Sequence, residues 1–407
     1  MEQARRDFLK RAGIGATALA APDLAAEPGK EAVTDLDFSW DTVPRFLYIS
    51  GNKQFTREEL DYIARTSYWV TFAINFAKDD FATYDDAVEH TATELKKRNP
   101  RIKVLYYWNT TRRIGQYGRV NEEFDLHPEW DVSQGKLGRL RNGNPIRMVQ
   151  KQTTPEIDLS HPGARQWWLN NAFNALKKPY IDGLWVDATA RIYNKGVKAK
   201  LKKAGLWEQT EMGLHLMFEE LAEHYRDNNG LLIGNFLREH DDYPYDKLWQ
   251  YFDGSFVENH YNLIGEAISD SEYIKKVSNV ISRIQDAARV GKVIGFYAGG
   301  IWDPTYDPKQ YSFEERKQKL AKHLEYNLAL YLIVAEKHVY VEYNDGFRAD
   351  YHVWKAEFPE YYFKLGPPNG RAKKRGNVYT REFAHASVVL DIKKRKADIT
   401  WREESEN

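Results

Sequence analysis

Short apolar runs rich in β-branched and aromatic residues recur along the chain, and segments with helical periodicity separate them. The runs predict eight strands, at residues 45–50, 69–75, 103–109, 181–187, 231–236, 252–259, 292–299 and 338–343. Helices are expected between and after them, at residues 58–66, 84–98, 160–178, 209–226, 273–290, 314–336 and 354–363. This alternation favours an α/β fold, a (β/α)8 TIM barrel over residues 45–365, with a doubly wound open sheet as the alternative.

The pattern changes after Gly366-Pro367-Pro368. Residues 378–383, 386–392 and 397–401 are short alternating runs with turn residues between them, so residues 366–407 are expected to form a small β appendage. Residues 27–44, which contain Pro28 and Pro44, are expected to be a linker and a lead-in to the first strand.

Residues 1–26 resemble a twin-arginine export signal. The pair Arg5-Arg6 precedes Phe8-Leu9-Lys10, a weakly apolar stretch and small residues that fit a cleavage site, although Ala4 stands where that pattern usually has Ser or Thr. A basic amphipathic starter helix is the alternative. No later stretch has the roughly 18 apolar residues that a membrane span needs. We therefore expect an exported protein, periplasmic or extracellular, with no membrane contact after removal of the signal.

Composition narrows the class of partner. The 59 basic and 59 acidic residues cancel, which disfavours nucleic acid as a ligand. The chain has no cysteine, which excludes disulfides, thiolate metal sites and a cysteine nucleophile. Aromatic residues make up 14% of the chain; they stack on sugar rings as well as they fill cores, so they favour a carbohydrate substrate without deciding for it. The sequence leaves the oligomeric state open.

The connection after the third predicted strand, residues 110–156, is too long for a plain loop and is typical of a functional one. Its second half carries basic residues with no acid among them, namely Lys136, Arg139, Arg141, Arg147 and Lys151. Such a cluster favours sulfate or uronate groups on the substrate. The alternative is a solvated loop whose charges only aid solubility.

The fourth and sixth predicted strands repeat one pattern, an Asp-Gly turn, an apolar strand and then an acid. The acids are Asp187 and Glu258, and the carboxyl ends of barrel strands are where such folds place their chemistry. Two facing carboxylates are what glycosidic cleavage needs, and their separation decides between retention and inversion. Asp182 and Asp253 more simply form the turns into their strands. A structural role for Asp187, such as an ion pair with Arg191, is the alternative.

Other polar and aromatic residues at or near the ends of the predicted strands are candidates for substrate binding. They are Trp108, Asn109, Trp185, Arg191, Asn235, Glu239, Asn259, His260, Tyr261, Tyr297, Trp302, Asp303, Glu342 and Asn344. Glu239 also competes with Glu258 for the role of acid. His260 is close enough to Glu258 to share a metal, but no ligand cluster accompanies it, so neither a metal nor a cofactor is expected. A barrel that binds polysaccharide without cleaving it, and a metal-dependent hydrolase, remain as alternatives.

Several of these stretches resemble the hypothetical glycosyl hydrolase barrels, in particular family fifteen of that series. They are Ile157-Asp158-Leu159-Ser160-His161-Pro162, the two segments that end in Asp187 and Glu258-Asn259, and Leu365-Gly366-Pro367 with Arg381-Glu382-Phe383. The resemblance implies a (β/α)8 fold with a small β tail and a glycosidase directed at a poly- or oligosaccharide. The sequence does not decide between retention and inversion; for a retaining enzyme, analogy with alpha-galactosidase-like and alpha-amylase-like barrels implies that Asp187 is the nucleophile and Glu258 the acid/base. The alpha-amylase family would place its acid after the fifth strand, where Glu239 stands.

Overall fold

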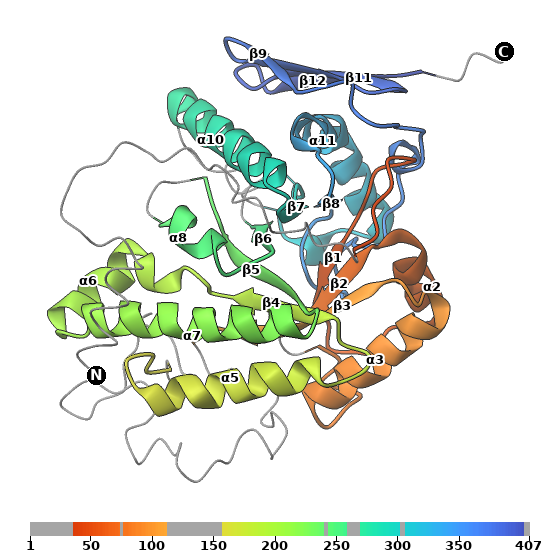
Figure 1. Cartoon of the computed structure of the whole chain (residues 1–407). Helices are drawn as coiled ribbons and strands as arrows, with labels where there is room; N and C mark the ends of the chain where they lie inside the picture. The colour runs from red at the N-terminus through yellow and green to blue at the C-terminus, as the bar shows by residue number, and fades with distance from the viewer. Residues whose placement is uncertain are drawn as a thin grey trace. The chain divides into compact units, whose positions relative to one another are not determined.

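Six stretches of the chain are described by the computed structural model (Figure 1). They are residues 36–73, 76–111, 157–239, 243–258, 269–301 and 306–402. The predicted signal, residues 1–26, and the basic residues between 110 and 156 lie outside them.

Eight strands of the described residues form one parallel sheet in sequential order. They are β1 (Leu47–Ile49), β2 (Trp69–Phe72), β3 (Lys103–Asn109), β4 (Gly183–Asp187), β5 (Leu231–Leu237), β6 (Gly254–Val257), β7 (Val293–Tyr297) and β8 (Val339–Glu342). Val341 joins β8 to the start of β1, since its N–H donates to Pro44 O at 3.0 Å and its carbonyl accepts from Phe46 N–H at 3.3 Å. The predicted (β/α)8 barrel is therefore confirmed, and the open doubly wound sheet is excluded.

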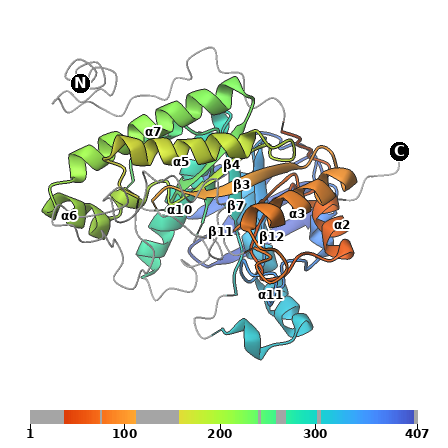
Figure 2. The same ribbon diagram turned by 90° about the horizontal axis from the view of Figure 1, so that it is seen from below.

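Helices follow the strands and cover the barrel. They are α2 (Arg57–Thr66), α3 (Tyr84–Arg98), α5 (Pro162–Leu176), α6 (Lys195–Lys203), α7 (Trp207–Asp227), α8 (Tyr245–Trp249), α10 (Asp270–Arg289) and α11 (Phe313–Val334). Thr56 with Glu59 and Ser312 with Glu315 form capping boxes that fix the first turns of α2 and α11. Helices α5 and α7 lie side by side (Figure 2), and they contact β4 and β5, respectively. In the described part of the chain, no helix is both long and apolar enough for a membrane span.

The helix expected at residues 354–363 does not form. This segment holds only the 3-10 turn η6 (Pro359–Tyr361). From Trp354 to Pro359, buried and exposed residues alternate with a period of two, which is the period of an extended chain. Pro359 also lacks the N–H that a helix interior requires. The prediction was wrong because the apolar residues of this segment follow the period of an extended chain and not that of a helix.

The repeated Asp-Gly pairs are structural. Asp182 accepts a hydrogen bond from Val104 N–H at 2.8 Å, and Asp253 accepts one from Leu232 N–H at 2.9 Å. Each carboxylate therefore ties the start of its strand to the preceding strand. A Cβ added at Gly183 would lie 2.1 Å from Leu231 O, so only glycine allows β4 and β5 to approach this closely.

Aromatic rings fill much of the barrel interior, where branched aliphatic residues are more usual. Phe46 stacks on Trp69 with ring centroids 4.3 Å apart, and Trp185 stacks on Tyr48 at 4.7 Å and on Tyr107 at 5.4 Å. These side chains are fully or largely buried. A good part of the aromatic content of the sequence is thus explained by packing.

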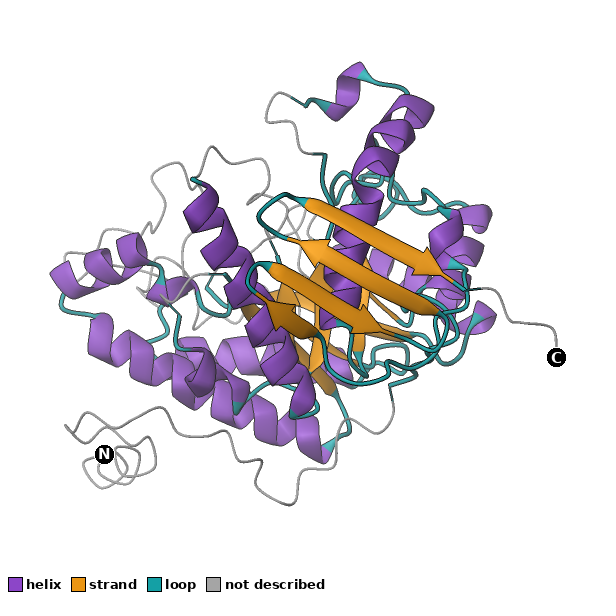
Figure 3. Ribbon diagram, turned by 90° about the horizontal axis from the view of Figure 1, so that it is seen from above, coloured by secondary structure: helices purple, strands orange, loops and turns teal. Residues whose placement is uncertain are grey.

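The carboxyl-terminal segment forms an antiparallel sheet of four strands in the described residues, in the order β12-β11-β10-β9 (Figure 3). The strands are β9 (Lys373–Arg375), β10 (Val378–Glu382), β11 (Ala386–Asp391) and β12 (Lys396–Trp401). The sheet packs on α11. Arg381 anchors it there, since its guanidinium donates to Ile333 O at 3.0 Å and pairs with Glu336 at 2.7 Å. The predicted β appendage is therefore present.

Candidate active site

Asp187 is the last residue of β4, and four donors hold its carboxylate. Oδ2 accepts from the Tyr107 hydroxyl at 2.5 Å and from the Asn109 amide at 3.0 Å. Oδ1 accepts from Ala188 N–H at 2.7 Å and from the Asn235 amide at 3.0 Å. None of these donors is Arg191, so the ion pair considered as an alternative role for Asp187 is not what positions it. Four donors fix the orientation of this carboxylate.

Neighbouring strands set this geometry. Asn109 and Asp187 are paired across β3 and β4, and Trp168 fixes the Asn109 backbone by donating its indole N–H to Asn109 O at 2.9 Å. Thr110 donates both its N–H, at 3.0 Å, and its hydroxyl, at 2.8 Å, to Asp187 O. Ala188 adopts a positive φ of 55°, a conformation that non-glycine residues rarely take, and this turn brings its N–H to the Asp187 carboxylate.

One amide group joins the two acids of the repeated pattern. Asn235 Nδ2 donates to Asp187 Oδ1 at 3.0 Å and to Glu258 Oε2 at 2.9 Å. Asn235 Oδ1 accepts from Arg238 at 2.7 Å, which fixes the orientation of the amide because carboxylates only accept. Both carboxylate oxygens accept from the same nitrogen, at 3.0 and 2.9 Å, so they lie less than about 6 Å apart.

Glu258 follows β6 and lies beside a cation. Its Oε2 pairs with the Arg238 guanidinium at 3.0 Å. Burial raises the pKa of Glu258 above its ordinary value; Arg238 opposes this rise, the charge of Asp187 adds to it, and the hydrogen bond from Asn235 opposes it. Two neighbouring carboxyl groups with different environments are a common arrangement for an acid and a nucleophile.

An irregularity between β5 and β6 places Asn235. The pairing of the two strands shifts between Gly234 and Leu237. The Ser255 hydroxyl fills the gap, accepting from Leu237 N–H at 3.0 Å and donating to Gly234 O at 2.9 Å. Bulges of this kind often redirect a side chain next to an active site.

The pair lies in a pocket of about 420 Å³. Its lining residues are Asn109, Asp187, Ala188, Ala190, Arg191, Asn194, Gly196, Val197, Lys200, Asn235, Arg238, Tyr243 and Glu258. The pocket is large enough for a sugar unit. A carboxylate pair in such a pocket can transfer a proton and attack an electrophilic carbon from one side.

Residues 96–387 match the model of hypothetical glycosyl hydrolase family 15. The chain belongs to this family. The match confirms the family that the two repeated segments and residues 157–162 indicate. No curated protein sequence matches the chain.

Solved structures that resemble this family 15 barrel do so at low sequence identity. A noncanonic maltogenic alpha-amylase from Thermotoga neapolitana is 12% identical, with a TM-score of 0.49 and coverage of 86% of each chain. The glycoside hydrolase domain of PgaB from Bordetella bronchiseptica is 11% identical, with a TM-score of 0.42 and coverage of 74% of this chain and 93% of that one. A GH36 alpha-galactosidase from Geobacillus stearothermophilus is 10% identical, with a TM-score of 0.46 and coverage of 85% and 47%.

The other predicted site residues of the family 15 barrel lie in several places, and the first three groups of them are as follows. Asn109, Arg191 and Asn235 line the pocket with the two acids. Glu239 is absent from the lining, whereas its neighbour Arg238 contacts Glu258. The third group, Asn259, His260, Tyr261, Trp302 and Asp303, lies outside the described residues.

Trp108 and Trp185 are buried in different places. Trp108 packs against Trp167 and Trp168 of α5, with ring centroids 5.9 and 6.4 Å away, on the outer side of β3. Trp185 lies inside the barrel on the same side of β4 as Asp187, where it stacks on Tyr107. Neither lines the pocket.

Tyr297, Glu342 and Asn344 form a buried network of their own. The Tyr297 hydroxyl donates to Asn344 Oδ1 at 2.7 Å, and Asn344 Nδ2 donates to Glu342 Oε1 at 2.7 Å. Glu342 Oε2 accepts from Tyr48 N–H at 2.7 Å, which ties β8 to β1. Burial raises the pKa of Glu342 well above its ordinary value. These residues hold the barrel closed beside the pocket but do not line it.

Two residues of the site were missed in the sequence. Tyr107 shares a face of β3 with Asn109 because side chains two residues apart point the same way, whereas Trp108 points to the opposite face. Strict alternation from Asn109 would have found Tyr107. Arg238 carries no such signal, since it lies beyond the end of β5 and reaches Glu258 only through the fold.

Metal ligands are not gathered in the described residues, where no group of three or more His, Asp or Glu side chains has the arrangement of a metal site. The carboxylates of Asp187 and Glu258 share an amide donor instead.

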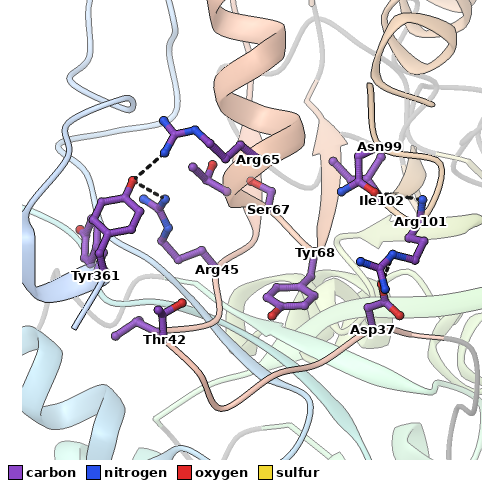
Figure 4. A pocket seen from close by; sticks show the side chains of 13 residues that line it. Asp37, Thr42, Arg45, Arg65, Ser67, Tyr68, Asn99, Arg101, Ile102 and Tyr361 are labelled. Atoms are coloured by element: carbon purple, nitrogen blue, oxygen red, sulfur yellow. Dashed lines mark hydrogen bonds and ion pairs between the residues drawn. The ribbon is translucent and has the colours of Figure 1, made fainter. Parts of the chain in front are cut away.

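A second pocket, of about 220 Å³, lies at the opposite end of the strands (Figure 4). Its lining includes residues that precede β1, β2 and β3, among them Arg45, Tyr68 and Arg101. Its charges are mostly used in packing: Arg101 pairs with Asp37 at 3.1 Å, and the Arg45 guanidinium lies 4.7 Å from the centroid of the Tyr361 ring. No predicted site residue lines this pocket. It belongs to the end of the barrel that usually serves stability.

Proposed function

We propose that this family 15 barrel is a retaining glycoside hydrolase in which Asp187 is the nucleophile and Glu258 the acid/base. The observation that carries the proposal is the shared amide of Asn235, which holds one oxygen of each carboxylate within about 6 Å of the other. Retaining enzymes keep their carboxyl groups about 5–5.5 Å apart, whereas inverting enzymes need about 6.5–9.5 Å to admit a water molecule.

The proposed reaction has two steps. Glu258 donates its proton to the glycosidic oxygen while Asp187 attacks the anomeric carbon, so that the C–O bond breaks, the leaving sugar departs as an alcohol and a glycosyl ester forms. Water then attacks the same carbon, gives its proton to the Glu258 carboxylate and releases Asp187. The raised pKa of Glu258 supports the first role, because a protonated acid is needed at the start.

A panel of neutral, uronic and sulfated glycans tests the proposal. New reducing ends should form with the wild type and fall by about 10³-fold or more in Asp187→Asn and Glu258→Gln. Glu239→Gln is the matched control, since Glu239 follows β5 but does not line the pocket, and it should keep near-normal activity. Proton NMR identifies the anomer that is released first. This anomer should have the same configuration as the glycosidic bond that was cleaved.

Two outcomes would favour other functions, and a third would favour another mechanism. Glycan binding with no new reducing ends would favour a non-catalytic polysaccharide-binding barrel. Activity that disappears on exhaustive chelation and returns with a metal would favour a metal-dependent hydrolase. First release of the inverted anomer would keep the hydrolase and overturn the covalent step.

We also propose that the protein is exported to the periplasm or beyond by the twin-arginine route. The support is the sequence Arg5-Arg6-Asp7-Phe8-Leu9-Lys10 and the small residues that follow it. Replacing both arginines with lysine should leave the full-length protein in the cytoplasm of a bacterium that has this route. Unchanged export of that variant would contradict the proposal.

A further inference from the structure

One wall of the pocket is cationic. It is built by the 3-10 turn η4 (Arg191–Tyr193) and by the first two turns of α6, and Arg191, Asn194, Gly196 and Lys200 line it. In the described part of the lining, the charged residues besides Asp187, Glu258 and Arg238 are Arg191 and Lys200. Both are cations, and both face the space next to the proposed nucleophile.

The sequence around this wall is also rich in cations and has no acid. From residue 191 to residue 203 the chain carries six cations and no acid, namely Arg191, Lys195, Lys198, Lys200, Lys202 and Lys203. Lys198 is used in packing, with its ammonium 4.5 Å from the centroid of the Trp207 ring. Repulsion among clustered like charges opposes folding, so a wall of this kind is more stable when an anion lies against it.

The charged residues that line the pocket also favour an anionic ligand. Among the described residues that line the pocket, three are cations, Arg191, Lys200 and Arg238, and two are carboxylates, Asp187 and Glu258. A pocket with an excess of positive charge attracts an anionic ligand and discriminates against a cationic one.

We propose that the sugar bound in this pocket carries a negative charge, a carboxylate or a sulfate ester, and that Arg191 and Lys200 bind it. The inference rests on the proposed glycoside hydrolase function and adds the chemical class of the substrate. Arginine binds the planar carboxylate or the sulfate through two parallel N–H bonds, and lysine adds a point charge from the next helix.

Binding to the Asp187→Asn protein tests the proposal without requiring turnover. A uronic oligosaccharide, a sulfated oligosaccharide and their carboxyl-reduced and desulfated counterparts are titrated by calorimetry. One charged member should bind at least about 10-fold more tightly than its neutral counterpart, and its affinity should fall as salt rises. Which member it is separates the carboxylate from the sulfate ester.

Lys200→Gln, made in the same background, should weaken binding of that charged glycan by about 10-fold and leave the neutral counterpart unchanged. Lys202→Gln is the matched control, because Lys202 lies on the same helix, is exposed and does not line the pocket. Arg191→Gln should act like Lys200→Gln.

Equal affinity for charged and neutral glycans, or equal effects of Lys200→Gln and Lys202→Gln, would overturn the inference. The hydrolase proposal would still stand if the wild type cleaved neutral glycans and Asp187→Asn did not. Conversely, charge-dependent binding without any cleavage by the wild type would keep the inference about the ligand and remove the hydrolase.

Discussion

The hydroxyl of Tyr107 donates a hydrogen bond of 2.5 Å to Asp187 Oδ2 from the neighbouring strand of the barrel. Burial and the charge of Asp187 raise the pKa of Tyr107 well above its ordinary value, so the phenol stays a donor throughout the working pH range. Tyr107 also stacks on Trp185, which fixes the direction of the bond. The orientation of the proposed nucleophile thus depends on a residue that itself belongs to the aromatic interior.

Tyr107→Phe should lower kcat/KM by about 10-fold, because Asp187 Oδ2 loses one of its two donors and the carboxylate can rotate. Tyr106→Phe is the matched control, since Tyr106 precedes it on β3 and donates to Asp85 outside the pocket. Steady-state kinetics on any glycan that the wild type cleaves measures both. Equal kcat/KM for Tyr107→Phe and the wild type would show that this bond does not matter for catalysis.

Arg238→Gln should move the alkaline limb of the pH profile of kcat/KM to higher pH. Activity falls as pH rises through the pKa of Glu258, because the acid must be protonated in the first step. The positive charge of Arg238 opposes the rise in that pKa, so its removal lets the pKa rise further. Arg226→Gln, at an exposed position near the end of α7, should leave the limb in place. A limb that moves to lower pH in Arg238→Gln would contradict Glu258 as the acid.

Glu342→Gln should destabilise the fold by about 1–3 kcal/mol. The NH₂ group of the new amide cannot accept a hydrogen bond, so it would face one of the two N–H donors that bind the Glu342 carboxylate. The two carboxylate oxygens of Glu342 accept from Tyr48 N–H and from Asn344 Nδ2, both at 2.7 Å. Chemical denaturation measures the loss. Glu314→Gln, at an exposed position in the first turn of α11, should change stability little. Unchanged stability of Glu342→Gln would mean that this network does not hold β8 to β1.

Gly183→Ala should destabilise the protein by about 3 kcal/mol, because the new Cβ meets backbone that cannot move aside. The added atom would lie 2.1 Å from Leu231 O. Gly196→Ala is the control in thermal unfolding, since its nearest neighbour would be Asn194 Oδ1 at 3.5 Å. A wild-type melting temperature for Gly183→Ala would show that β4 and β5 can separate at little cost.

Much of the barrel could be predicted from the sequence because its strands are short apolar runs between turn residues. The prediction failed at residues 354–363, where buried aromatic residues alternate along an extended chain. It also missed α6, a lysine-rich helix whose buried residues are Val197 and Leu201. Two buried residues are too few to give a clear helical period.

The site was predictable where a residue stands at the end of its strand. Asp187 and Glu258 were found from the repeated pattern, and Asn109 and Asn235 from their positions at strand ends. Arg238 was not, because its contact with Glu258 depends on the shifted pairing between β5 and β6 and on the position of β6 beside it. Trp108 does not join Asn109 in the pocket, because neighbouring residues of a strand face opposite sides of the sheet.

The most direct test of the central claim is to locate a trapped intermediate. The Glu258→Gln protein is mixed with an aryl glycoside whose phenol leaves without a proton donor, and the digested protein is analysed by mass spectrometry. Because the first step proceeds and the second lacks its base, a glycosyl ester should accumulate on the peptide that contains Asp187. An ester on another acid, or hydrolysis of the glycoside by this protein with no ester on Asp187, would contradict the account.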